Sequence, residues 1–144
     1  MARPPRIPVW LHWDQSVTYF ITLCVEGRRR VLDNAAVFDA VQRFCSAEKR
    51  WTTSALVLMP DHLHAIIQPM EREAPVTQYS AGLKRFVRKQ TKAAWKWQEG
   101  VFDRLLRREE SAHEKWLYAR ENPVRAGLVS RWEDWPWFIG IGEL

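Results

Sequence analysis

Two histidines separated by a single residue, His62 and His64, stand where an apolar run resumes after a Pro-Asp turn. Side chains in a strand alternate between faces, so both imidazoles are expected on one side and Leu63 on the other. Two strand steps place their Cα atoms about 6–7 Å apart. Two imidazoles at that separation can converge on one metal ion or one phosphate, although such a pair also occurs as ordinary half-exposed residues.

A run of basic residues with helical spacing forms a second candidate site. Pro75 suits the start of a helix, which we predict from about Val76 to Trp97. No acidic residue occurs from Lys84 to Lys96, whereas a solvated helix face usually mixes both signs of charge. The stripe therefore favours contact with nucleic-acid phosphates. The predicted DNA contacts are Lys84, Arg85, Arg88, Lys89, Lys92, Arg104, Arg107 and Arg108.

A third candidate group lies on a predicted C-terminal helix. Ser111 and Glu114 have the spacing of a capping box, which predicts that the helix starts there. Pro123 predicts its end. Tyr118 and Asn122 are then one turn apart on the same helix face. Tyr118 can also be a core residue, and Asn122 can simply mark the end of the helix.

The hydrophobic pattern predicts the elements that must position these groups. The β-branched and aromatic run Val17–Val25 is typical of a strand. Asp33 or Asn34 can cap a helix that reaches about Lys49, with apolar residues at helical spacing. Two apolar strands then flank the Pro-Asp turn before His62, and the basic helix follows.

This order of elements predicts an α+β fold of the ferredoxin-like (RRM-like) kind. We expect an antiparallel sheet with helices packed on one face, plus a C-terminal helix that carries the tyrosine. The fourth strand is expected from residues 101–102 or 128–129. The Trp-rich end after Gly127 is expected to be a packing tail. Residues 1–144 are expected to form one domain.

Composition limits the classes of partner and compartment. The formal net charge of +5 and the pI of about 9.6 favour a polyanionic partner. Cys24 and Cys45 fit no metal or redox spacing and indicate a reducing compartment. Apolar runs stay well short of about 18 residues, so a membrane span is not expected. We expect a cytoplasmic, nucleoid-associated protein.

Four blocks in the same order resemble the REP-associated tyrosine transposases, bacterial relatives of the single-tyrosine HUH transposases. The blocks are Tyr19-Phe20-Ile21-Thr22-Leu23, then Val57-Leu58-Met59-Pro60-Asp61-His62-Leu63-His64, then Trp97-Gln98 with Phe102-Asp103 and Arg107, and finally Tyr118-Ala119-Arg120-Glu121-Asn122-Pro123-Val124-Arg125-Ala126-Gly127-Leu128-Val129. Together they span most of the chain.

The resemblance implies a transposase that cleaves and rejoins single-stranded, hairpin-associated DNA as a monomer or a homodimer. The hydroxyl of Tyr118 would attack a phosphodiester and keep the 5′ phosphate. A phenol is a weak nucleophile near neutral pH, so the reaction needs a divalent metal, Mg²⁺ or Mn²⁺. The implied ligands are His62, His64 and Asn122, the last one turn after the tyrosine.

Two other function classes compete with this one. A non-catalytic module could hold single-stranded or hairpin nucleic acid on the basic helix. A metal-dependent phosphoesterase could use water in place of tyrosine, but only one H-x-H motif occurs in the chain. The histidine pair together with Tyr118 favours the transposase, because binding alone needs neither.

Overall fold

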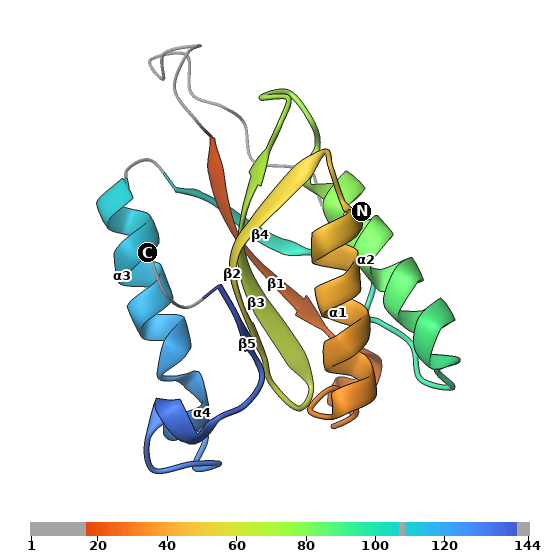
Figure 1. Cartoon of the computed structure of the whole chain (residues 1–144), viewed down its shortest axis with the longest axis vertical. Coiled ribbons are helices and arrows are strands. Elements are labelled where there is room, and N and C mark those ends of the chain that lie inside the picture. The colour runs from red at the N-terminus through yellow and green to blue at the C-terminus, as the bar shows by residue number, and fades with distance from the viewer. Residues whose placement is uncertain (1–16, 107–108, 141–144) are drawn as a thin grey trace.

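The computed structural model describes residues 17–106 and 109–140 (Figure 1). The strands are β1 (Thr18–Cys24), β2 (Trp51–Leu58), β3 (His62–Pro69), β4 (Phe102–Leu106) and β5 (Phe138–Ile139). The helices are α1 (Ala35–Ala47), α2 (Val76–Thr91), α3 (Glu109–Arg120) and α4 (Asn122–Arg125), with the short 3₁₀ turns η1 (Glu26–Arg28) and η2 (Trp132–Asp134).

The strands form one antiparallel sheet in the order β4-β1-β3-β2-β5. The first four follow the ferredoxin-like arrangement, which confirms the predicted fold class. The fourth strand begins at Phe102, as the first of the two alternatives predicted, while residues 128–129 lie in a bend and an irregular segment. The Trp-rich end was predicted only to pack, but it also adds β5 along the edge of β2.

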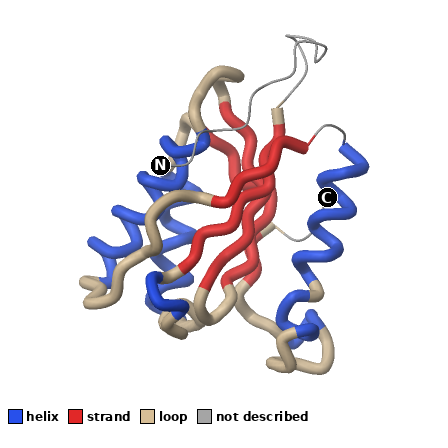
Figure 2. Tube along the Cα trace, turned by 180° about the vertical axis from the view of Figure 1, so that it is seen from behind, coloured by secondary structure: helices blue, strands red, loops and turns tan. Residues whose placement is uncertain are grey.

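The sheet separates two helical layers (Figures 1 and 2). Helices α1 and α2 cover one face, over a core that includes Leu56, Leu58 and Leu63. Helix α3 covers the other face, over a smaller core that includes Val57 and Trp116. Neighbouring residues of one strand thus enter different cores, as the alternation of a strand requires.

Two predicted helix boundaries are wrong. Helix α2 ends at Thr91 and not at Trp97, because Lys92 adopts a left-handed conformation with φ 50° and its N–H bonds to the Arg88 carbonyl. The chain then turns back, and Trp97 pairs with Val25 beyond the end of β1. Helix α3 begins at Glu109, so Ser111 lies within its first turn and does not cap it.

The start of α1 agrees with the prediction. Asn34 is extended, and its side-chain oxygen accepts a hydrogen bond from the Val37 N–H at 3.0 Å. Across residues 17–106 and 109–140, helices are too short or too polar to cross a lipid bilayer.

Candidate functional site

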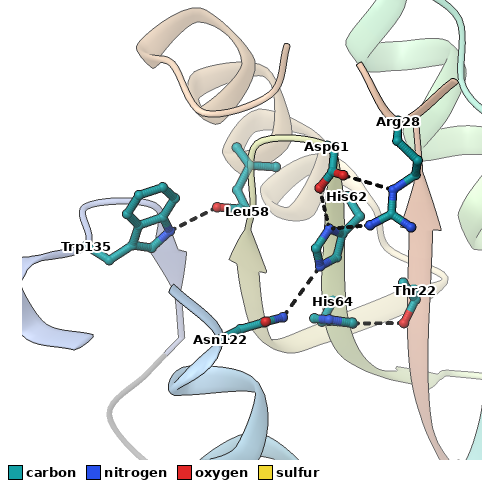
Figure 3. A network of polar contacts seen from close by, with 8 residues as sticks. All are labelled: Thr22, Arg28, Leu58, Asp61, His62, His64, Asn122 and Trp135. Carbon is teal, nitrogen blue, oxygen red and sulfur yellow. Dashed lines mark hydrogen bonds and ion pairs between the residues drawn. The ribbon is translucent and has the colours of Figure 1, made fainter. Parts of the chain in front are cut away.

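The two histidines open β3 and face the α3 side of the sheet (Figure 3). Leu63 between them is fully buried in the core under α1 and α2. The imidazole rings meet edge to face, with centroids 4.9 Å apart. The strand alternation predicted from the sequence is therefore confirmed, and Leu63 anchors the pair to the core.

Each imidazole has a polar partner at Nδ1. His62 Nδ1 lies 2.7 Å from a carboxylate oxygen of Asp61, and His64 Nδ1 lies 2.8 Å from the Thr22 hydroxyl on β1. A carboxylate can only accept, so Nδ1 of His62 carries the proton and its Nε2 keeps a lone pair. The Asn122 amide nitrogen, 3.5 Å from that Nε2, contacts the same lone pair. Such outer hydrogen bonds orient imidazoles that bind metals.

Burial keeps both imidazoles neutral. It lowers the pKa of His62, although the nearby Asp61 carboxylate opposes the shift. Burial likewise lowers the pKa of His64 to about 3, and unfavourable electrostatic interactions with His62, Arg125 and Arg28 add to the effect. Neutral imidazole is the form that binds a metal ion.

Asp61 is itself held in its charged form by two neighbours. Burial alone would raise its pKa, but hydrogen bonds from His62 and Arg28 outweigh burial, so the pKa lies below its usual range. Arg28 belongs to η1, and its Nε donates a hydrogen bond of 2.9 Å to the Asp61 carboxylate. Arg28, Asp61 and His62 therefore form a chain of contacts that fixes the orientation of the first imidazole (Figure 3).

The donors around the histidines suit a divalent ion. Both imidazoles have Nε2 available, and rotating the Asn122 amide would present its oxygen in place of its nitrogen. Groups of three His, Cys, Asp or Glu side chains suited to metal binding are absent from residues 17–106 and 109–140. The Asn122 amide is the polar group that α4 brings to the histidine pair.

Tyr118 lies in the last turn of α3 and is 65% exposed, so it is not a core residue. It does not share a helix with Asn122, because α3 ends at Arg120 and Asn122 opens α4. The predicted single helix face is thus wrong. The segment nevertheless brings Asn122 to His62, and the guanidinium carbon of Arg125 lies 3.7 Å from the centre of the Tyr118 ring.

The predicted DNA contacts divide into different groups. Lys84 is half-buried, and its Nζ donates to the carbonyls of Gln98 and Gly100 at 2.9 and 2.6 Å. Arg88 donates to the Trp95 carbonyl at 3.1 Å. These two side chains thus tie α2 to residues 92–100.

Exposed basic residues of α2 and of the turn after it line an open groove. Arg85 and Lys89 of α2 and Lys92 after its end are exposed and line this groove of about 920 Å³ beside residues 93–100, and Lys84 and Arg88 also contribute to its lining. Arg104 is exposed on the edge strand β4, whereas Arg107 and Arg108 lie outside the described residues. The groove belongs to the α2 layer, across the sheet from the histidines.

The first 3₁₀ turn connects these two surfaces. The Glu26 N–H donates to the Lys96 carbonyl beside the groove at 2.9 Å, and Arg28 reaches Asp61 beside the histidines. Sequence reasoning placed neither Asp61 nor Thr22 beside the histidines. The position of Asp61 next to His62 was an available signal, while Thr22 becomes a neighbour of His64 only through the register of β1 with β3.

The comparisons with known proteins agree with this description. No protein-family model matches the chain. A Haemophilus influenzae protein named as a REP-associated tyrosine transposase is 26% identical over 139 residues, which cover 83% of this chain and 77% of that protein. The chain is therefore similar to a REP-associated tyrosine transposase. The resemblance predicted from the sequence blocks is thereby confirmed.

Two solved structures share the fold with the chain. A REP-associated tyrosine transposase bound to a REP hairpin superposes with a TM-score of 0.76, at 20% identity, over 96% of this chain and 82% of that one. A Deinococcus radiodurans protein named as a transposase superposes with a TM-score of 0.53, at 15% identity, over 79% and 94%. At these identities the superpositions establish the fold.

Proposed function

We propose that this protein is a metal-dependent, single-strand DNA endonuclease and transposase that cleaves and rejoins REP-like, hairpin-associated DNA. The proposal is carried by one observation: the segment that holds the exposed Tyr118 also brings Asn122 within 3.5 Å of His62. This contact supports a shared site for the proposed nucleophile Tyr118 and the three candidate metal ligands. The similarity to a REP-associated transposase supports the choice of DNA as substrate.

In the proposed reaction, side chains of this protein orient the metal ligands, bind the metal ion and attack the phosphate. Asp61 and Thr22 orient the imidazoles, and His62, His64 and Asn122 would hold Mg²⁺ or Mn²⁺. Such an ion, when bound, polarises the phosphate and stabilises charge on the leaving oxygen. The Tyr118 oxygen forms a bond to phosphorus, the bond to the 3′ oxygen breaks, and the proton lost by the phenol is balanced by one gained at the 3′ hydroxyl. Rejoining is the reverse reaction.

The exposed cations of the α2 groove are the candidates for holding the DNA backbone. Arg85, Lys89 and Lys92 lie along an open groove without the carbonyl contacts that occupy Lys84 and Arg88. Phosphate contacts of this kind provide affinity without sequence readout. A DNA substrate of this kind would also associate the protein with the nucleoid in the cytoplasm.

A covalent-adduct assay tests the proposal. Labelled hairpin DNA with a single-stranded flank is mixed with protein and Mn²⁺ or Mg²⁺ and run on a denaturing gel. We expect a labelled band at the combined mass that requires metal and disappears in Tyr118→Phe. That variant keeps the ring and its stacking on Arg125, so its hairpin affinity should match the wild type and serves as the control.

The competing functions give other outcomes. Hydrolysis that survives Tyr118→Phe without an adduct would indicate a phosphoesterase that uses water. A salt-sensitive mobility shift on a native gel, without cleavage by the wild type, would indicate a binding module. Either result would overturn the proposed reaction.

A further inference from the structure

Arg125 lies against the exposed Tyr118 ring, on the segment that also contacts the histidine pair. It belongs to α4, whose first residue, Asn122, contacts His62. Its guanidinium carbon lies 3.7 Å from the centre of the Tyr118 ring, a close cation–π stack. The ring is 65% exposed, so this stack is a major restraint on it. One four-residue helix thus ties Tyr118 to the site.

The guanidinium of Arg125 is available for a further contact. Arg28 already donates to Asp61. Arg125, by contrast, has no carboxylate partner among residues 17–106 and 109–140. A guanidinium that stacks by its face keeps its in-plane N–H groups free to donate.

We propose that Arg125 positions the Tyr118 ring beside the histidines and donates a hydrogen bond to a non-bridging oxygen of the phosphodiester that Tyr118 attacks. The inference rests on the proposed role of Tyr118 as nucleophile. A phosphate is the natural ligand, because planar guanidinium N–H groups match phosphate oxygens. The same cation would then align nucleophile and target, which is the geometric requirement of a near-attack arrangement.

The chain contains a matched control. Arg120 in α3 stacks on Trp132, with its guanidinium carbon 4.4 Å from the ring centre. It is an arginine–aromatic stack of the same kind, next to α4, and no contact joins it to the histidines or to Tyr118. Arg120→Gln therefore removes a comparable stack, together with a 4.0 Å ion pair to Glu121, and leaves the Arg125–Tyr118 stack in place.

The positioning role is tested without DNA or metal by ¹⁹F NMR of protein labelled with 3-fluorotyrosine. The chain has three tyrosines, and Tyr19 and Tyr79 are buried, so the Tyr118 resonance is assigned by its loss in Tyr118→Phe. We expect Arg125→Gln to move and broaden this resonance and Arg120→Gln to leave it in place. An unchanged resonance in Arg125→Gln, or an equal change in both variants, would overturn the positioning role.

The phosphate contact is tested by adding a short single-stranded oligonucleotide to the labelled protein without metal. We expect the Tyr118 resonance to shift in the wild type and to respond much less in Arg125→Gln. An equal response in both proteins would overturn the contact. Because neither NMR measurement requires cleavage, an inactive wild type would contradict the proposed reaction and leave this inference open to its own test.

The rate of covalent-adduct formation gives a third test of Arg125. We expect Arg125→Ala to slow adduct formation by about 10²-fold, the usual effect of losing one donor to a reacting oxyanion. Hairpin affinity should change less than about threefold, because the basic groove lies across the sheet. Added guanidinium ion at millimolar concentration should restore part of the rate in Arg125→Ala and none in Tyr118→Phe. A rate like that of the wild type, or a slow rate without rescue, would overturn the contact with phosphate.

Discussion

At the scale of single residues, two conditions favour the proposed metal binding at the histidine pair. The first is orientation, because the Nδ1 atoms of His62 and His64 lie against the Asp61 carboxylate and the Thr22 hydroxyl. Burial adds the second condition, since it suppresses protonation. Neutral, oriented imidazoles need little reorganisation when an ion arrives.

The same burial makes stability depend on pH. The folded-state pKa of His64, about 3, lies below the unfolded value near 6.5, so the unfolded chain binds more protons between these values. The contribution of neutral His64 to the free energy of unfolding is fully present above about pH 6.5 and is lost as the pH drops toward 3. We expect His64 alone to lower the free energy of unfolding by about 2 kcal/mol between pH 7.5 and pH 5.

Urea unfolding in the presence of EDTA measures this loss at the two pH values. His64→Gln removes the titrating group and keeps a polar side chain. Between pH 7.5 and pH 5, the free energy of unfolding of this variant should therefore fall by about 2 kcal/mol less than that of the wild type. Equal losses in the two proteins would contradict the prediction.

At the scale of elements, α2 uses its basic stripe for two purposes. Lys84 and Arg88 bind carbonyls of residues 95–100, while Arg85 and Lys89 remain exposed along the groove. Burial lowers the pKa of Lys84, as expected for an ammonium group that has left water. Equal spacing along a helix therefore does not imply equal roles.

This division predicts opposite effects for two sets of substitutions. Arg85→Ala with Lys89→Ala should weaken hairpin binding and reduce the slope of log affinity against log salt by about 2, with little loss of stability. Lys84→Ala should lower the free energy of unfolding by about 1.5–3 kcal/mol, because hydrogen bonds from a charged donor are lost. Fluorescence anisotropy at several salt concentrations and thermal unfolding give the two quantities. If Lys84→Ala reduced the slope of log affinity against log salt more than the Arg85→Ala and Lys89→Ala pair does, the division would be contradicted.

At the scale of the whole molecule, the sheet separates the layer with the proposed DNA-binding groove from the layer with the proposed catalytic residues. Helix α2 and the segment after it line the groove, while α3 and α4 carry Tyr118 and Asn122 on the opposite face (Figure 1). Trp135 fastens the second layer, because its indole N–H donates to the Leu58 carbonyl at 3.0 Å in the smaller core. Trp51 has a corresponding bond to Gln78 of α2 in the first layer.

The two tryptophans make the separation testable. Trp135→Phe and Trp51→Phe each remove one largely buried hydrogen bond and some volume, so each should lower stability by about 2 kcal/mol. Only Trp135→Phe should slow adduct formation beyond its loss of folded protein, since it loosens the layer that carries Tyr118. Unfolding curves and adduct rates measured well below the transition would reveal the difference. Equal slowing in both variants would contradict it.

The sequence by itself determined what depends on neighbouring residues. Period-2 alternation placed His62 and His64 on one face, Asp33 or Asn34 was expected to cap α1, and the order of apolar runs predicted the ferredoxin-like sheet. Such features follow from backbone geometry within a few residues.

Only the tertiary structure decided how distant segments meet. The left-handed turn at Lys92, the pairing of Trp97 with Val25 and the addition of β5 to β2 depend on partners far along the chain. The contact of Asn122 with His62 depends on the packing of α3 against its face of the sheet. The stack of Arg125 on Tyr118 depends on the break in the helix between α3 and α4. Periodicity carries no information about such contacts, because packing across the sheet sets them.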